Sequence, residues 1–66
     1  MQNSKTVFPE IFDAEDIAQV GKQFKSSAVR VLGQNYYEAT ITQKGVTLNV
    51  RGYMNFIGEP ATWFPI

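Results

Sequence analysis

The chain has no cysteine and no histidine among its 66 residues. Without cysteine it forms neither a disulfide nor a thiolate metal site. Without histidine it lacks the commonest general base and the commonest neutral metal ligand. The sequence also has no glycine-rich phosphate loop and no nucleophile elbow. The single glycines Gly33, Gly45, Gly52 and Gly58 stand at positions typical of turns or strand irregularities. We therefore expect a protein that is not an enzyme and that holds no cofactor or metal.

The chain also has no net charge, because its six basic residues balance six acidic ones. A basic excess is the usual footprint of a nucleic-acid-binding domain, and this chain does not show it. The opening residues lack the apolar stretch of a signal peptide, and no run approaches the roughly 18 apolar residues of a membrane span. These observations predict a soluble, cytoplasmic protein with no membrane partner.

At this length we expect one thin-cored domain over residues 1–66, with an N-terminal arm at 1–11 and a tail at 54–66. A helix is predicted over 14–26. Asp13 precedes it as a cap, and Ile17, Val20 and Phe24 recur at helical spacing. The acidic residues at its start complement the helix dipole. Gly21 lies beside the apolar stripe, which suggests the close approach of another backbone.

From residue 28 onward the apolar residues recur with a period of two, which predicts a three-stranded antiparallel meander. A two-residue turn at Lys44-Gly45 places Ile41 opposite Leu48 and puts the apolar residues of both strands on one side. A three-residue loop over 33–35 places Val31 opposite Tyr37. The competing interpretation continues the helix through 28–32 and ends it at Gly33. In the tail, 61–64 can add a short fourth strand, with Pro65 restricting it to an edge.

The predicted fold class is α+β, with one N-terminal helix packed on a three- or four-stranded antiparallel sheet. The apolar side chains that point toward the helix in this arrangement form the predicted core. Its members are Ile17, Val20, Phe24, Val29, Val31, Tyr37, Ala39, Ile41, Leu48 and Val50.

The opposite face of the sheet carries the candidate binding residues. Tyr36 and Tyr53 are expected to lie opposite each other beside Leu32, next to a row made of Arg30, Glu38 and Arg51. Trp63 and Phe64 in the tail either cover the tyrosines or belong to the same surface. Tyrosine, tryptophan and arginine are the residue types enriched at protein interface hot spots. The predicted protein-binding residues are Arg30, Leu32, Tyr36, Arg51, Tyr53, Trp63 and Phe64.

From these features we expect a small non-catalytic protein-binding module that regulates or inhibits another protein, of the kind that phages and mobile elements also encode. One alternative is a single-stranded nucleic-acid-binding protein in which Tyr36 and Tyr53 stack on bases. Another is a structural homodimer, joined through an uncapped edge strand over 46–53. The sequence does not identify the partner.

Overall fold

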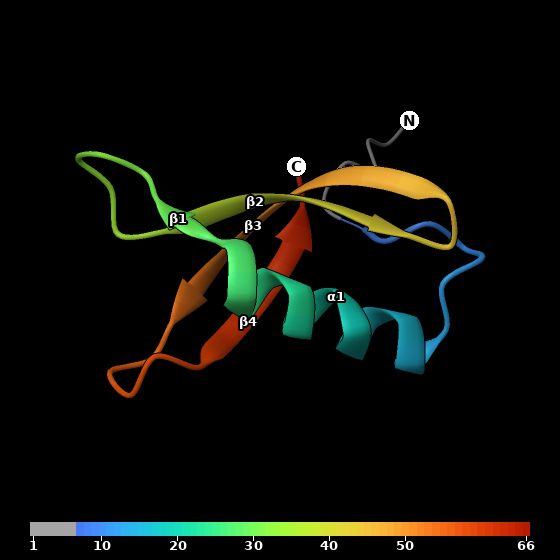
Figure 1. Ribbon diagram of the computed structural model, residues 1–66, viewed down its shortest axis with the longest axis horizontal. Coiled ribbons are helices and arrows are strands. Elements are labelled where there is room, and N and C mark those ends of the chain that lie inside the picture. The colour runs from blue at the N-terminus through green and yellow to red at the C-terminus, as the bar shows by residue number, and fades with distance from the viewer. Residues whose placement is uncertain (1–6) are drawn as a thin grey trace.

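The computed structural model describes residues 7–66 and contains one helix packed on a four-stranded antiparallel sheet (Figure 1). The sheet has the order β1-β2-β3-β4, so each strand pairs with its neighbours along the chain. The predicted α+β meander is therefore confirmed, and the tail supplies the fourth strand. Residues 1–6 of the predicted arm lie outside the described residues. The elements are α1 Ala14–Ser27, β1 Val29–Arg30, β2 Tyr37–Gln43, β3 Val46–Met54 and β4 Pro60–Pro65.

Helix α1 begins at a capping box. The side chain of Asp13 accepts a hydrogen bond from the backbone N–H of Asp16 at 2.9 Å, and the Asp16 side chain accepts one from the Asp13 N–H at 3.0 Å. Two of the free amide groups of the first turn are satisfied in this way. The helix ends at Ser27, one residue beyond the predicted end, and Ala28 is already extended. The strand interpretation of 28–32 is thus correct, although β1 covers two residues of it.

The β2–β3 hairpin has the predicted register, with Gln43 opposite Val46 and Ile41 opposite Leu48. Its turn residues both have positive φ, 54° at Lys44 and 75° at Gly45. That backbone twist matches the right-handed twist of the strands in a two-residue hairpin. In this register the apolar side chains of both strands lie on the side of the sheet that faces the helix.

The β1–β2 register differs from the prediction by one residue. Val29 lies opposite Glu38, and Arg30 lies opposite Tyr37. The physical reason is the loop, which has four residues instead of three, because the Val31 N–H bonds to the Tyr36 carbonyl at 3.0 Å. A one-residue shift turns each side chain to the other face. Val29 is therefore 70% exposed, and its prediction as a core residue was wrong.

The core lies between α1 and the sheet and is smaller than the predicted one. Five apolar side chains are buried, and nine partly buried residues pack against them. Ile17, Tyr37, Ala39 and Leu48 belong to the second group as expected, whereas Val31 belongs to neither group. Among the described residues, the five buried apolar side chains of the core are Phe12, Val20, Phe24, Ile41 and Val50.

Both edges of the sheet are short or interrupted: no described strand lies beside residues 39–43 of β2 on the β1 side, and β4 carries two prolines. At one edge β1 is two residues long, and the Thr42 carbonyl beyond it accepts a 3.3 Å hydrogen bond from the Gln23 side chain. At the other edge β4 begins and ends with proline. Pro65 lies opposite Val50. The N–H of the next residue, Ile66, donates to the Asn49 carbonyl on β3, so the backbone nitrogen of Pro65 points away from β3, toward the free edge of the sheet. The missing N–H of Pro65 therefore interrupts that free edge. The predicted free edge over 46–53 is instead paired with β4 from Val50 to Met54.

Candidate protein-binding face

We call the side of the sheet turned away from α1 the outer face. Its residues follow from the strand registers, because side chains alternate between the two faces of a sheet. The middle row crosses all four strands and consists of Val29, Glu38, Arg51 and Phe64. The other members are Tyr36, Thr40, Thr42, Thr47, Asn49, Tyr53, Thr62 and, directly after β4, Ile66.

The two tyrosines of the outer face contact each other, as the sequence predicted. The Tyr36 and Tyr53 rings have centroids 6.3 Å apart and meet edge to face at an interplanar angle of 77°. That geometry places the positive edge of one ring on the negative face of the other, which stabilises the pair beyond its buried area. Tyr53 is still 42% exposed.

Arg51 joins this pair to Glu38. Its guanidinium carbon lies 4.1 Å from the Tyr36 ring centroid, a cation–π contact. Its Nη2 and Nε atoms lie 2.7 Å and 2.9 Å from the same carboxylate oxygen, Oε2 of Glu38. The hydrogen bonds to Glu38 raise the pKa of Arg51 above its ordinary value, so the guanidinium stays charged. The four side chains Tyr36, Glu38, Arg51 and Tyr53 form one connected group, which we call the tyrosine cluster.

Arg30 does not take its predicted place beside Glu38. The one-residue shift of β1 puts it on the side of Tyr37, and its Nε donates a 3.0 Å hydrogen bond to the Gln34 carbonyl. Val29 occupies the vacated end of the middle row, and Phe64 occupies the other end. The predicted arginine–glutamate–arginine row is therefore wrong, and an apolar residue stands at each end instead.

The two aromatic residues of the tail lie on different faces. Phe64 lies opposite Arg51 on the outer face, as one predicted alternative had it. Trp63 is on the helix side, where its indole Nε1 donates a 3.0 Å hydrogen bond to the Ile17 carbonyl. It therefore covers neither tyrosine and packs against the core. Leu32 is 97% exposed in the β1–β2 loop.

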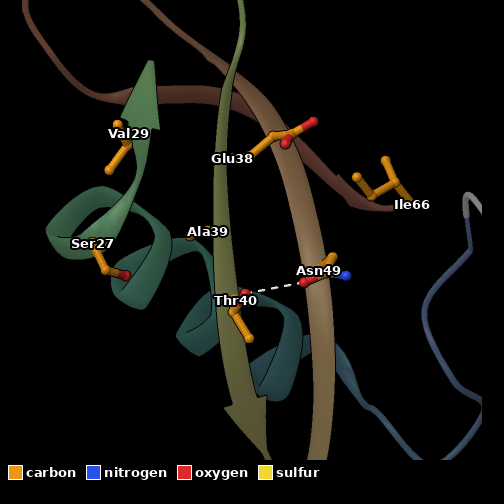
Figure 2. A pocket seen from close by; sticks show the side chains of 7 residues that line it. All are labelled: Ser27, Val29, Glu38, Ala39, Thr40, Asn49 and Ile66. Carbon is orange, nitrogen blue, oxygen red and sulfur yellow. Dashed lines mark hydrogen bonds between the residues drawn. The ribbon is translucent and has the colours of Figure 1, made fainter. Parts of the chain in front are cut away.

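Next to the tyrosine cluster the outer face is hollowed, with a volume of about 440 Å³ (Figure 2). Glu38, Thr40 and Asn49 form its polar floor, and Thr40 Oγ1 bonds to Asn49 Oδ1 at 3.0 Å. Val29 and Ile66, which is 43% exposed, stand on its two sides (Figure 2). Sequence reasoning missed both wall residues, because their positions depend on the registers of β1 and β4.

A second group of exposed apolar residues lies on the loops. The β1–β2 and β3–β4 loops project from the same end of the molecule (Figure 1). Phe56, at the tip of the β3–β4 loop, is fully exposed. Hydrogen bonds from the N–H groups of Ile57 and Glu59 to the Asn55 side chain hold this loop. Sequence reasoning gave the Phe56 tip no role.

No protein-family model, no curated protein and no solved structure matches this chain. Within residues 7–66, no three acidic side chains come together as a metal site would require. In the same part of the chain, the helix is too short and too polar to cross a membrane. The outer face, which no described element covers, carries the tyrosine cluster and the adjoining hollow and is the candidate site.

Proposed function

We propose that the protein is a non-catalytic protein-binding module whose interface is the outer face. In this proposal it regulates or inhibits another protein by covering part of that protein's surface. The observation that carries the proposal is the tyrosine cluster. Two tyrosines and an arginine contact one another on a sheet face that no described element covers. A sheet face turned away from the core is otherwise expected to be polar.

The composition of the outer face supports this proposal. Tyrosine and arginine are enriched among the residues that carry most of the binding energy at protein interfaces. Around the cluster, Thr40 bonds to Asn49, and Thr42 bonds to Thr47 at 2.9 Å, which provides a polar rim. Phe64 and Val29 add apolar area at the ends of the middle row.

The rigidity of the cluster also favours binding. Arg51 is held by two contacts to Glu38 and by the Tyr36 ring, so its side chain is ordered before any partner arrives. Ordering a long side chain on binding costs about 0.5–1.5 kcal/mol, and a preorganised one avoids most of that cost. The sheet itself positions the tyrosines through the two-residue turn of the hairpin.

Single-stranded nucleic acid is the weaker alternative partner. Base stacking needs a free ring face, and the Arg51 guanidinium already lies over one face of Tyr36. The same guanidinium is neutralised by Glu38, so it adds little attraction for phosphate. Both contacts support a protein partner over a nucleic acid.

Affinity capture from a lysate tests the proposal. The bait is the full chain, compared with a Tyr36→Ala/Tyr53→Ala double variant and with a Phe56→Ser control that changes an exposed loop tip. Circular dichroism first establishes that all three chains are folded. We expect a specific partner to be retained by the wild type and by the control and lost by the double variant. Equal recovery by all three would exclude the outer face as the interface, and titration with single-stranded DNA and RNA at low salt tests the alternative.

A further inference from the structure

We infer that the outer face binds the outer face of a second copy of this chain, so that the tyrosine pair of each copy enters the hollow of the other. The inference rests on the proposed function, because it names a partner for the same face. The second copy occupies the face whenever another target does not.

The shape of the face supports a two-fold pairing. By the strand register, the Tyr36–Tyr53 pair lies at one end of the outer face, one row beyond Glu38 and Arg51. The hollow floored by Glu38, Thr40 and Asn49 begins at that row (Figure 2). A two-fold axis that lies in the plane of the interface, between these two features, brings each onto the other in the second copy. An interface of this isologous kind needs one surface that carries both a projection and its matching recess.

The chemistry of the hollow fits a tyrosine side chain. Its walls, Val29 and Ile66, are apolar, whereas its floor is polar. Both guanidinium contacts of Arg51 go to Oε2 of Glu38, which leaves Oε1 as an acceptor for a hydroxyl group. Asn49 accepts from Thr40 through Oδ1, and its amide nitrogen lies on the side away from Thr40 (Figure 2). A tyrosine has an apolar ring and a polar tip, which match these walls and this floor.

Charge also permits self-association through this face. The charged side chains of its strands, Glu38 and Arg51, form a pair with each other, so the face has no net charge. Two identical faces therefore carry no net charge that would oppose their approach. Pairing through the sheet edges is a poor alternative, since β1 is two residues long and β4 ends in proline.

A dimer interface of standard size would take only a modest share of this chain's surface. A standard interface takes about 800 Å² from each partner, which is less than a fifth of the 4531 Å² surface of the chain. The core contains five buried apolar residues, and chains of this size gain stability from oligomerisation. The midpoint of thermal unfolding should therefore rise with protein concentration, as mass action requires.

Sedimentation equilibrium of the full chain, at concentrations up to about 1 mM, tests the inference. We expect a monomer–dimer equilibrium. Tyr53→Ala removes the projection, and Asn49→Arg fills the hollow and places like charges at the interface, so each should weaken the dimer by about tenfold or more. Phe56→Ser lies outside the face and should leave the equilibrium unchanged. Circular dichroism establishes that each variant is folded.

An isotope-filtered NOE experiment on a mixture of labelled and unlabelled wild-type chains gives a second, independent measurement. We expect contacts between the Tyr53 ring of one copy and the methyl groups of Val29 or Ile66 of the other.

A chain that stays monomeric at about 1 mM would overturn the inference, as would a dimer that neither Tyr53→Ala nor Asn49→Arg weakens. A monomer that still captures another protein through its tyrosines would leave the proposed function standing. A dimer with these contacts and no tyrosine-dependent target would leave the inference standing and remove the regulator proposal.

Discussion

The indole ring of Trp63 lies directly against the backbone of Gly21. A Cβ atom built on Gly21 would stand 2.5 Å from Cζ2 of the ring, closer than real Cβ contacts allow. The glycine therefore provides the space in which β4 packs on α1, and the indole hydrogen bond to Ile17 fixes the ring there. The sequence predicted that another backbone approaches Gly21 closely, but the approaching group is a side chain.

Gly21→Ala should destabilise the protein, although alanine favours a helix by about 1 kcal/mol over glycine. The added methyl group collides with Trp63, and overpacking of this kind costs about 1–3 kcal/mol. Urea denaturation followed by circular dichroism measures the difference. Lys22→Ala, on the exposed side of the same helix, should change the free energy of unfolding by less than about 0.5 kcal/mol. A variant more stable than the wild type would mean that Trp63 can move away without cost.

Gly52→Ala should destabilise the protein more than Gly21→Ala does. A Cβ atom on Gly52 would meet the backbone carbonyl of Thr62 and would lie 2.9 Å from Cε2 of the buried Phe24. A paired backbone carbonyl cannot rotate away as a side chain can, so we expect a loss of about 3 kcal/mol or more. The same urea titration measures it, with Thr62→Ala as a control on the outer face of the neighbouring strand. Equal effects of the two glycine substitutions would contradict this ordering.

Asp16 makes the stability of the protein depend on pH. Its carboxylate accepts hydrogen bonds from Lys44, from the Asp13 backbone and from Gln43, and these lower its pKa well below the ordinary range, with Lys44 contributing most. Because the folded-state pKa is lowered, the stabilisation is complete above the unfolded pKa of about 3.9 and is lost as the pH falls below it. Lys44 shows the reciprocal effect, since the hydrogen bond to Asp16 raises its pKa.

Asp16→Asn should therefore lower the free energy of unfolding at pH 7, and its difference from the wild type should shrink as the pH falls toward about 2. Urea denaturation across this range measures both curves. Glu15→Gln removes one negative charge from the same helical turn and serves as the control, with a much smaller loss of stability at pH 7 than Asp16→Asn causes. Parallel curves for Asp16→Asn and the wild type would show that Asp16 does not cause the acid dependence.

The contact between Arg51 and Tyr36 should appear as a coupling energy of about 0.5–1 kcal/mol in a double-mutant cycle, because the cation–π pair is partly exposed. The cycle compares Arg51→Met, Tyr36→Leu and the double variant by thermal and urea unfolding. A parallel cycle with Glu38→Gln should give about 0.2–1 kcal/mol for the ion pair, and less at high salt. Strict additivity in the first cycle would mean that the guanidinium gains nothing from the ring.

The parts of the fold that follow from local pattern could be predicted from the sequence. The Lys44-Gly45 turn accepts positive φ at both positions, and each flanking strand alternates apolar and polar residues, so one register alone buries the apolar set. In the segment before β2 the alternation covers only residues 29–31 and is broken at Leu32, so it is too short to fix one register. Loops of three and of four residues between β1 and β2 are both compatible with Gly33 and Asn35. Because of this ambiguity, the predicted β1–β2 register was wrong by one residue.

The same distinction applies to the candidate site. Glu38, Arg51 and Tyr53 belong to the β2–β3 hairpin and Tyr36 directly precedes β2, so their proximity follows from the hairpin register. Arg30 and Trp63 were assigned to the outer face although their orientation depends on β1 and β4. The bulge between Tyr53 and Met54 precedes β4, and no alternating pattern in the tail indicates which side of the sheet Trp63 takes.

The prolines of β4 have a consequence for how far this chain can assemble. Fibrils grow when a strand edge accepts an identical strand again and again, and each added strand leaves a new edge. Here one edge strand is two residues long, and the other begins and ends with proline. Each edge therefore offers an added strand only a short or interrupted row of backbone groups, so we expect a concentrated solution to stay clear and free of thioflavin-binding polymers.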